Sequence, residues 1–430
     1  MTATPNGSIG VLVVDDSPFM RLTIQKILST DSSIKVLDTA RDGREGIQKL
    51  QALRPHVVTM DIEMPVINGL QALDEIMRWQ PTPVIVLSSL TTQGAEATLK
   101  AFDLGAFDVV AKPSGGPGAD LNALAAELTE KIKAAAGAKI SRLGKRLPSG
   151  GDVAGLGLGH NQETAAVQPG MTGSVGLSGT GKAGSGFGNK GRAANPAGNN
   201  QPAGLGHTST ITTGNGSAVP IKTSGVYMHH AGLVFPKHKV EIVAIGTSTG
   251  GPSALQAVLP HLPAGFPVPV IVAQHMPPGF TGPLAQRLNG VCQLTVREGI
   301  SGEPLRAGII YIAPAGKQMQ VKKQGGQLVP QIGDESPIPT LYHPSVDVMF
   351  LSLAKEVGRG TLGVVMTGMG NDGSRGMKEI KSLEGFAIAE AEDTCVVYGM
   401  PRAIVDAGLA DRVVPLGDIG RAIVECVQRR

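Results

Sequence analysis

The sequence predicts an α/β protein with two doubly wound domains, and two observations support this prediction. Short apolar runs alternate with amphipathic helical patterns towards both ends of the 430-residue chain, as in parallel sheets covered by helices on both faces. Between these regions lies a long glycine-rich segment without any such alternation. We therefore expect two folded domains joined by a linker.

The first domain is expected over residues 8–136. Apolar residues at helical spacing, such as Met20, Ile24 and Leu28, indicate helices between the strands, and a last helix carries Leu121 and Leu128. Five strands that alternate with five helices predict a five-stranded parallel sheet. The expected strands are Val11–Val14, Lys35–Leu37, Val57–Met60, Val84–Leu87 and Val109–Ala111.

Residues 137–237 have the composition of a flexible linker. The segment from Gly137 to Gly225 holds 22 of the 59 glycines of the chain, interleaved with Ser, Asn, Ala and Thr. Large apolar residues are few, so the segment buries too little surface to offset the entropy of ordering. A glycine-rich repeat structure is the alternative, but no fixed period is visible.

The second α/β domain is expected over residues 238–430. Its predicted strands are Glu241–Ile245, Pro269–Ala273, Ile309–Ile312, Thr361–Met366 and Phe386–Ala389. The formal net charge is only +3, which gives no reason to expect binding to nucleic acid or an anionic membrane. Three cysteines form no disulfide framework, and no signal peptide or span of about 18 apolar residues is visible. We expect a cytoplasmic protein without membrane insertion.

Acidic side chains follow two strands of the first domain. Asp15 and Asp16 come directly after the first strand, and Asp61 follows the third. Ligands of doubly wound sheets bind at the carboxyl ends of strands, and three carboxylates there would repel one another without a cation such as Mg²⁺. Ser88 and Lys112 end the fourth and fifth strands, where they could contact a phosphoryl group on Asp61.

Each of these residues also has an ordinary interpretation. Asp16 or Ser17 could cap a helix, and a lysine before proline is usually a solvated loop residue. Their joint placement at four strand ends is much harder to obtain by chance. The segments VVDDSPFMR, MDIEMPVINGL, VIVLSS and AKP resemble the receiver domain of two-component response regulators over about residues 9–136. The resemblance implies Asp61 as phosphoacceptor, Asp15, Asp16 and Asp61 as Mg²⁺ ligands, Ser88 and Lys112 as switch residues, and a histidine kinase as phosphodonor.

A candidate nucleophile lies in the second domain. Gly246–Gly250 reads G-x-S-x-G between a strand and a predicted helix, and such a turn exposes its central serine, Ser248. A phosphate-binding loop is the alternative interpretation, but Pro252 stands where that motif requires lysine. A purely structural glycine turn is also common, so the serine needs a base to support it.

His275 is the candidate base because it directly follows the strand Pro269–Ala273, whereas His261 and His343 follow no strand. Asp372, in a glycine-rich turn after the strand Thr361–Met366, is the candidate acid; Asp347 lies in a helical pattern. Asp372 as a helix cap is about equally plausible when it is considered alone. Backbone N–H groups of Thr249 or of the Met369–Gly370 turn are candidates for stabilising an oxyanion, without any cofactor.

The order serine, histidine, aspartate differs from the order in common lipases. We therefore expect a hydrolase-like doubly wound domain with another topology, in which His275 deprotonates Ser248 and Asp372 orients the imidazole. AIGTSTGGPSAL, QHMPPGFT, YIAP, HPSVDVMF, MTGMGNDG and VVYGMPR resemble the catalytic domain of chemotaxis protein-glutamate methylesterases over about residues 240–426. The order of the two domains is also that of this family, although its linkers are shorter.

This second resemblance implies Ser248, His275 and Asp372 as a catalytic triad. It implies hydrolysis of glutamate γ-methyl esters on chemoreceptors, and deamidation of receptor glutamines, under control of receiver phosphorylation. A phosphorylation-dependent binding module with a decayed esterase is one alternative function, against which the intact set of three residues argues. An enzyme for small-molecule esters is the other, but a methyl ester supplies little binding energy, which favours a protein substrate.

Overall fold

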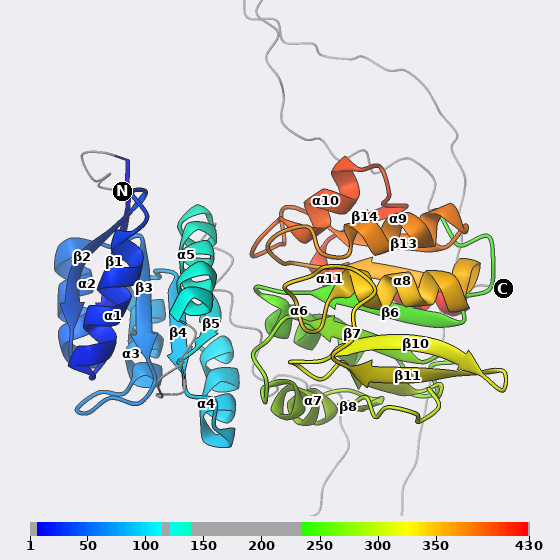
Figure 1. Cartoon of the computed structure of the whole chain (residues 1–430), viewed down its shortest axis with the longest axis horizontal. Helices are drawn as coiled ribbons and strands as arrows, with labels where there is room; N and C mark the ends of the chain where they lie inside the picture. Colours follow the sequence, from blue (N-terminus) through cyan, green and yellow to red (C-terminus); the bar gives the residue numbers. More distant parts are fainter. Residues whose placement is uncertain (1–6, 114–120, 139–233, 429–430) are drawn as a thin grey trace, which may run out of the picture. The chain divides into compact units, whose positions relative to one another are not determined.

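The computed structural model describes residues 7–113, 121–138 and 234–428. These residues form two α/β domains, which are the expected receiver-like domain and the expected hydrolase-like domain (Figure 1). Apart from its two ends, the predicted linker over 137–237 lies outside the described residues. Within the described ranges, no helix has the length and apolar character that crossing a membrane requires.

The first domain is built on five parallel strands in the order β2-β1-β3-β4-β5, which confirms the predicted doubly wound sheet. The strands are β1 (Ile9–Val14), β2 (Ile34–Ala40), β3 (Val57–Asp61), β4 (Val84–Ser88) and β5 (Asp108–Ala111). The edge strand β2 is longer than expected. Most of its residues are partly exposed, so it lacks the continuous apolar run that marks the central strands.

Helices cover both faces of this sheet. They are α1 (Pro18–Ser29), α2 (Gly43–Leu53), α3 (Gly69–Trp79), α4 (Thr92–Asp103) and α5 (Leu121–Gly137). Helices α1 and α5 pack together, whereas α2, α3 and α4 contact one another in series. Of the apolar residues that predicted α1 and α5, Ile24 and Leu128 are buried, whereas Leu121, at the start of α5, is exposed. Asn68 begins α3 with a complete capping box to Gln71.

The second domain contains seven parallel strands in the order β14-β13-β12-β6-β7-β9-β8. They are β6 (Ile242–Thr247), β7 (Val270–Gln274), β8 (Thr295–Glu298), β9 (Ile309–Ile312), β12 (Thr361–Val365), β13 (Phe386–Glu390) and β14 (Arg412–Val414). The five expected strands are present, with small differences at their ends. Strands β8 and β14 were not predicted, because both are short, partly exposed edge strands.

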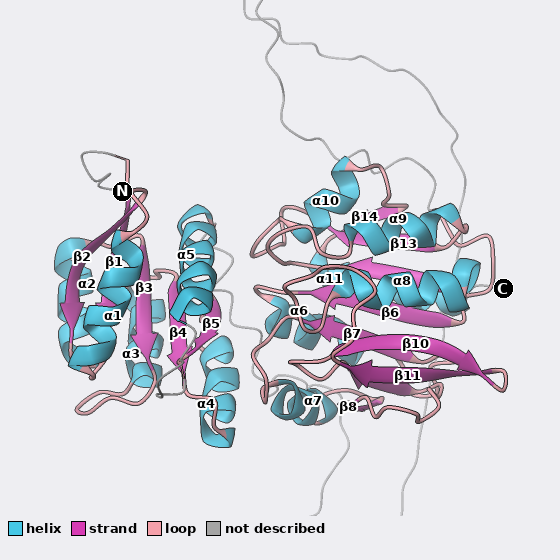
Figure 2. Ribbon diagram, in the orientation of Figure 1, coloured by secondary structure: helices cyan, strands magenta, loops and turns pink. Residues whose placement is uncertain are grey.

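A hairpin and two groups of helices complete this domain (Figure 2). The antiparallel hairpin of β10 (Gln318–Gln324) and β11 (Gln327–Gly333) was also not predicted, and α8 (Val346–Glu356) packs against β10. Helix α8 also contacts α9 (Ser374–Ser382), which contacts α10 (Met400–Asp406). A second group joins α6 (Gly251–Val258), the 3-10 turn η2 (Leu259–His261), α7 (Thr281–Asn289) and α11 (Leu416–Gln428); another 3-10 turn, η3 (Gly358–Gly360), precedes β12.

The connectivity gives each sheet a point at which the strand order reverses. In the first domain β1 pairs with both β2 and β3, and in the second domain β6 pairs with both β7 and β12. At such a point successive crossovers leave the sheet in opposite directions, and doubly wound proteins place their ligands there. Asp15, Asp61, Ser248 and His275 follow or end strands at these points.

Candidate functional site

Ser248 lies directly after β6, the middle strand of the seven-stranded sheet. Gly250 has a φ of 79°, which a residue with a side chain rarely adopts, and α6 begins at the next residue. The Ser248 N–H donates to the carbonyl oxygen of Thr367 at 3.0 Å. Gly368 approaches so closely that an added Cβ would lie 2.9 Å from the Cβ of Ser248. The turn after β6 is therefore fixed against the turn after β12.

His275 lies beside Ser248 at the end of the neighbouring strand. Strands β6 and β7 are paired in register up to Thr247 and Gln274, so Ser248 and His275 are the next residues on each side. The His275 N–H donates to the Thr247 carbonyl oxygen at 3.1 Å and continues the pairing. The sequence prediction that these two residues leave the same end of the sheet therefore agrees with the pairing of the strands.

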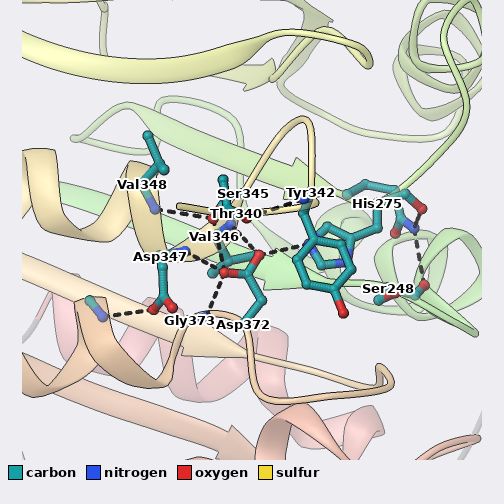
Figure 3. A network of polar contacts seen from close by, with 12 residues as sticks. Ser248, His275, Thr340, Tyr342, Ser345, Val346, Asp347, Val348, Asp372 and Gly373 are labelled. Carbon is teal, nitrogen blue, oxygen red and sulfur yellow. Dashed lines mark hydrogen bonds and ion pairs between the residues drawn. The ribbon is translucent and has the colours of Figure 1, made fainter. Parts of the chain in front are cut away.

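The third candidate residue, Asp372, contacts the imidazole of His275. Its Oδ2 lies 2.8 Å from His275 Nε2, and its side chain is only 3% exposed. The carboxylate also sits at the start of α8 (Figure 3). The Ser345 hydroxyl donates to Oδ1 at 2.9 Å, and the N–H groups of Val346 and Asp347 donate to Oδ2 and Oδ1 at 2.7 and 2.9 Å. A helix N-terminus is a favourable place for a negative charge.

These contacts keep the carboxyl group of Asp372 ionised. Burial alone would raise its pKa, but the hydrogen bond and charge of His275, with the backbone N–H groups of α8, hold the pKa below its ordinary value. Asp372 thus contacts the N-terminus of α8 through Val346, which lies 26 residues earlier in the sequence. The alternative prediction was that Asp372 caps the helix that follows its own turn. Its lowered pKa suits a group that stabilises an imidazolium.

The hydrogen bond to Asp372 determines which nitrogen of His275 can accept a proton. An ionised carboxylate only accepts hydrogen bonds, so the Nε2 that faces it carries the hydrogen. The other nitrogen, Nδ1, is buried and has no hydrogen-bond partner among the described residues. Nδ1 is therefore an available acceptor on the residue beside Ser248, and it is the opposite nitrogen from the one that serves as base in chymotrypsin.

Gln274 connects the two chain segments that carry Ser248 and His275, a role that the sequence analysis missed. Its buried side chain donates from Nε2 to the carbonyl oxygens of Ser248 and His275 at 3.0 and 2.8 Å. Gln274 comes directly before His275, at the end of an apolar strand. The signal available in the sequence was that Gln274 is a polar residue at a position expected to be buried.

Two further contacts come from the loop before α8. The Tyr342 ring stacks on the His275 ring with a centroid distance of 4.3 Å and an interplanar angle of 8°. Ser345 is the N-cap residue of α8 as well as the partner of Asp372. A serine before a helical pattern signals a cap, but no periodicity in this loop indicated that Tyr342 reaches the site.

Two backbone N–H groups are available near Ser248. Within the described chain, neither the Thr249 N–H nor the Met369 N–H donates to a backbone or side-chain acceptor. Met369 follows Gly368, the residue in contact with Ser248. These two groups are the candidates that the sequence predicted for an oxyanion hole.

The rival residues have other roles. His261 ends the 3-10 turn η2, and His343 is exposed. Asp347 lies in the first turn of α8 and accepts a hydrogen bond from the N–H of Gly376 at 2.7 Å. None of the three is bonded to Ser248 or His275 among the described contacts.

The first domain gathers its acidic residues around one lysine. Lys112 Nζ lies 2.7 Å from Asp61 Oδ2 and 3.0 Å from Asp15 Oδ2. Burial raises the pKa of Asp61 to about 6, although the hydrogen bond and charge of Lys112 oppose this effect. Burial alone would lower the pKa of Lys112, but Asp61 and Asp15 together hold it above its ordinary value.

The carboxylates of Asp15, Asp16 and Asp61 fit a divalent cation. One oxygen from each lies within 4.8 Å of the others. An all-oxygen donor set of three carboxylates is suited to Mg²⁺. The alternative prediction for Asp16 was a helix cap. Ser17 caps α1 instead, so the exposed Asp16 is not needed in that role.

A cavity of about 260 Å³ opens beside Asp61, and Asp16, Ser88 and Lys112 also line it. The buried Ser88 hydroxyl donates to the Gly94 carbonyl oxygen at 3.0 Å. The structure therefore brings all five sequence-predicted residues of the first domain to the carboxyl end of its sheet.

The fold and its two sites define a two-domain α/β protein with a serine, histidine and aspartate cluster in the second domain and an acidic pocket in the first. Residues 243–423 match the CheB methylesterase family, and residues 11–121 match the response regulator receiver domain. The protein-glutamate methylesterase/protein-glutamine glutaminase of Desulfitobacterium hafniense is 64% identical over 99% of each chain. The protein of that name from Moorella thermoacetica is 44% identical over 98% of this chain and 99% of its own.

Among solved structures, the Thermotoga maritima CheB methylesterase catalytic domain is 40% identical, with a TM-score of 0.42, and covers 44% of this chain and 99% of its own. Full-length identity to the curated relatives establishes the family. The chain belongs to the protein-glutamate methylesterase/protein-glutamine glutaminase family, with an N-terminal response regulator receiver domain.

Proposed function

We propose that Ser248, His275 and Asp372 carry out acyl transfer on glutamate γ-methyl esters and on specific glutamines of chemoreceptors, as part of chemotactic adaptation. The observation that carries this proposal is the state of His275. Its Nε2 is bound to the carboxylate of Asp372, whereas its buried Nδ1 has no hydrogen-bond partner among the described residues. The paired ends of β6 and β7 bring the backbones of Ser248 and His275 side by side.

In the proposed acylation step, Ser248 Oγ attacks the γ-carbonyl carbon while its proton moves to His275 Nδ1. The developing oxyanion accepts hydrogen bonds from the N–H groups of Thr249 and Met369. Asp372 stabilises the imidazolium through Nε2. When the tetrahedral intermediate collapses, the C–O bond to the methoxy group breaks, and the leaving oxygen takes the proton from Nδ1 to give methanol.

The acyl-enzyme then reacts with water. Nδ1 accepts a proton from the attacking water molecule, and the returning serine oxygen takes that proton as the ester bond breaks. The product is the γ-carboxylic acid of glutamate. A glutamine side chain follows the same path with ammonia as the leaving group, so both activities use one set of residues.

For the receiver domain we propose that Asp61 accepts a phosphoryl group from a histidine kinase. Asp15, Asp16 and Asp61 would hold Mg²⁺, which when bound neutralises phosphoryl oxygens. Lys112 already faces Asp61 and would pair with the added phosphate charge. Ser88 would change its hydrogen bond from Gly94 to a phosphoryl oxygen and so signal the modification. We assign the receiver to residues 8–136, the linker to 137–237 and the catalytic domain to 238–430.

The experiment that tests the catalytic proposal is release of methanol from receptor membranes that carry labelled methyl esters. We expect Ser248→Ala to lower kcat by several orders of magnitude without unfolding the domain, because it removes one hydroxyl from a glycine turn. Ser382→Ala is the matched control, because that hydroxyl is exposed and bonds only within α9. Equal methanol release by wild type and Ser248→Ala would refute the assignment of the nucleophile.

A further inference from the structure

We infer that Tyr342 is a positioning residue for His275, which keeps the imidazole in the plane where Nδ1 faces the nucleophile. This inference rests on the proposed function of His275 as general base. The observation behind it is the parallel stack of the two rings, with centroids 4.3 Å apart (Figure 3). Tyr342 comes from the loop between β11 and α8, far in sequence from β7.

The imidazole needs a contact of this kind because its other constraints leave one rotation free. The ring is attached through Cβ and is hydrogen-bonded at Nε2 to Asp372. These two points allow the ring to tilt about the line that joins them, and a tilt moves Nδ1 out of the position that the proposed proton transfer from Ser248 requires. Nδ1 has no hydrogen bond that would resist this tilt. A flat aromatic face against the ring opposes it directly.

Tyr342 is itself held by a buried amide. Gln318, on β10, donates from Nε2 to the Tyr342 carbonyl oxygen at 2.6 Å and accepts the Ser345 N–H at Oε1 at 2.8 Å. Its side chain is 1% exposed. Gln318 thus fixes both ends of the segment 342–345. One end stacks on His275, and the other end donates the Ser345 hydroxyl to Asp372.

The aromatic ring of Tyr342, and not its hydroxyl group, carries this role. The hydroxyl oxygen lies near Gly370 and makes no hydrogen bond to any described residue. Burial raises the pKa of Tyr342 above its ordinary value, so the phenol stays protonated near neutral pH and is no base. The ring face also offers a favourable electrostatic surface to the imidazolium that forms during each turnover.

The test compares three variants of the full-length protein in the methanol-release assay. Tyr342→Leu removes the aromatic face, Tyr342→Phe removes only the hydroxyl, and Leu341→Ala changes the adjacent side chain, which is 95% exposed. We expect Tyr342→Leu to lower kcat about 10-fold or more, with KM unchanged. Tyr342→Phe and Leu341→Ala should keep kcat within about threefold of the wild type.

The proton NMR signal of the His275 Cε1–H supplies a second measurement. A stacked ring shifts this signal upfield, so we expect the shift in wild type and Tyr342→Phe and its loss in Tyr342→Leu. If Tyr342→Leu fails to fold, Tyr342→Met provides a flexible aliphatic side chain for the same comparison.

Three results would overturn the inference. They are full kcat in the folded aliphatic variant, an equal loss of kcat in Tyr342→Phe, or a rise in KM alone, which would indicate a contact with substrate. Ser248→Ala separates these results from failure of the proposed function. An inactive Ser248→Ala beside a fully active Tyr342→Leu refutes only the role of Tyr342, whereas an active Ser248→Ala refutes the nucleophile.

Discussion

The Ser345 hydroxyl donates to Asp372 Oδ1 at 2.9 Å while the same oxygen atom accepts the N–H of Val348. One side chain therefore begins α8 and orients the acid that contacts His275. Folding of this helix and alignment of the site depend on the same hydroxyl group.

Ser345→Ala should consequently affect stability and catalysis together. We expect the free energy of unfolding of the catalytic domain to fall by about 1–3 kcal/mol, through loss of a cap and of a hydrogen bond to a charge. We expect kcat to fall about 10-fold, because Asp372 loses one of the groups that orient it. Chemical denaturation and methanol release measure the two effects.

The control for this variant is Asn68→Ala, which removes the capping box of α3 in the receiver domain. It should lower the stability of the receiver domain by about 1 kcal/mol and leave the basal kcat unchanged. An unchanged kcat in Ser345→Ala, with the expected loss of stability, would mean that Ser345 is only a helix cap.

The lowered pKa of Asp372 predicts how the catalytic domain responds to acid. The ordinary value is 3.8, and the folded domain holds the pKa below it. A depressed folded-state pKa contributes stability above the unfolded-state value, and this contribution is lost as the pH falls through the folded-state value. Wild type should therefore lose stability from pH 5 to pH 3 more steeply than Asp372→Asn. Equal slopes in denaturation series at these pH values would contradict the prediction.

Gly251 is a position where a side chain should disturb the nucleophile turn. An added Cβ would lie 1.9 Å from Gln274 Oε1 and 2.6 Å from Thr247 Oγ1. We expect Gly251→Ala to lower kcat by about 100-fold. The new methyl group would displace the Gln274 side chain, which hydrogen-bonds to the carbonyl oxygens of both Ser248 and His275. Gly417→Ala is matched to it, since Gly417 also lies in the first turn of a helix but has open space around it. Equal activity of the two variants would show that the turn tolerates displacement.

Asp61→Asn should remove control of the esterase by phosphorylation. Acetyl phosphate with Mg²⁺ should raise the rate of methanol release by wild type, and chelation of Mg²⁺ by EDTA should abolish the increase. Asp61→Asn should keep the basal rate without the increase, whereas Asp74→Asn, on α3 outside the pocket, should respond like wild type. A full response of Asp61→Asn would place the phosphorylation elsewhere or separate it from the enzyme.

The positions of most principal residues followed from the sequence because they lie at the ends of buried parallel strands, whereas Asp372 lies in the turn between β12 and α9. Apolar runs predict such strands, and residues such as Asp61, Ser248 and His275 directly follow or end them. Strands β8 and β14 and the β10–β11 hairpin were missed because their residues are partly exposed and form no continuous apolar run. Patterning therefore identified the centre of each sheet better than its edges.

The sequence could not predict the arrangement around the imidazole. Which nitrogen of His275 meets Asp372 depends on the path of the loops after β12 and before α8. The loop that carries Tyr342 to His275 is hydrogen-bonded by Gln318, on an unpredicted strand. These contacts are tertiary and leave no period in the sequence.

The pairing of β6 with β12 has a consequence for synthesis of the protein. The ribosome releases the amino-terminal side first, so the strand that presents Ser248 emerges long before the strand that leads to Asp372. During this interval β6 lacks one of its two neighbours, and His275 lacks its carboxylate. A nascent chain of that length therefore lacks the carboxylate of the proposed triad. The proposed site is assembled only when the late strand pairs with the early one.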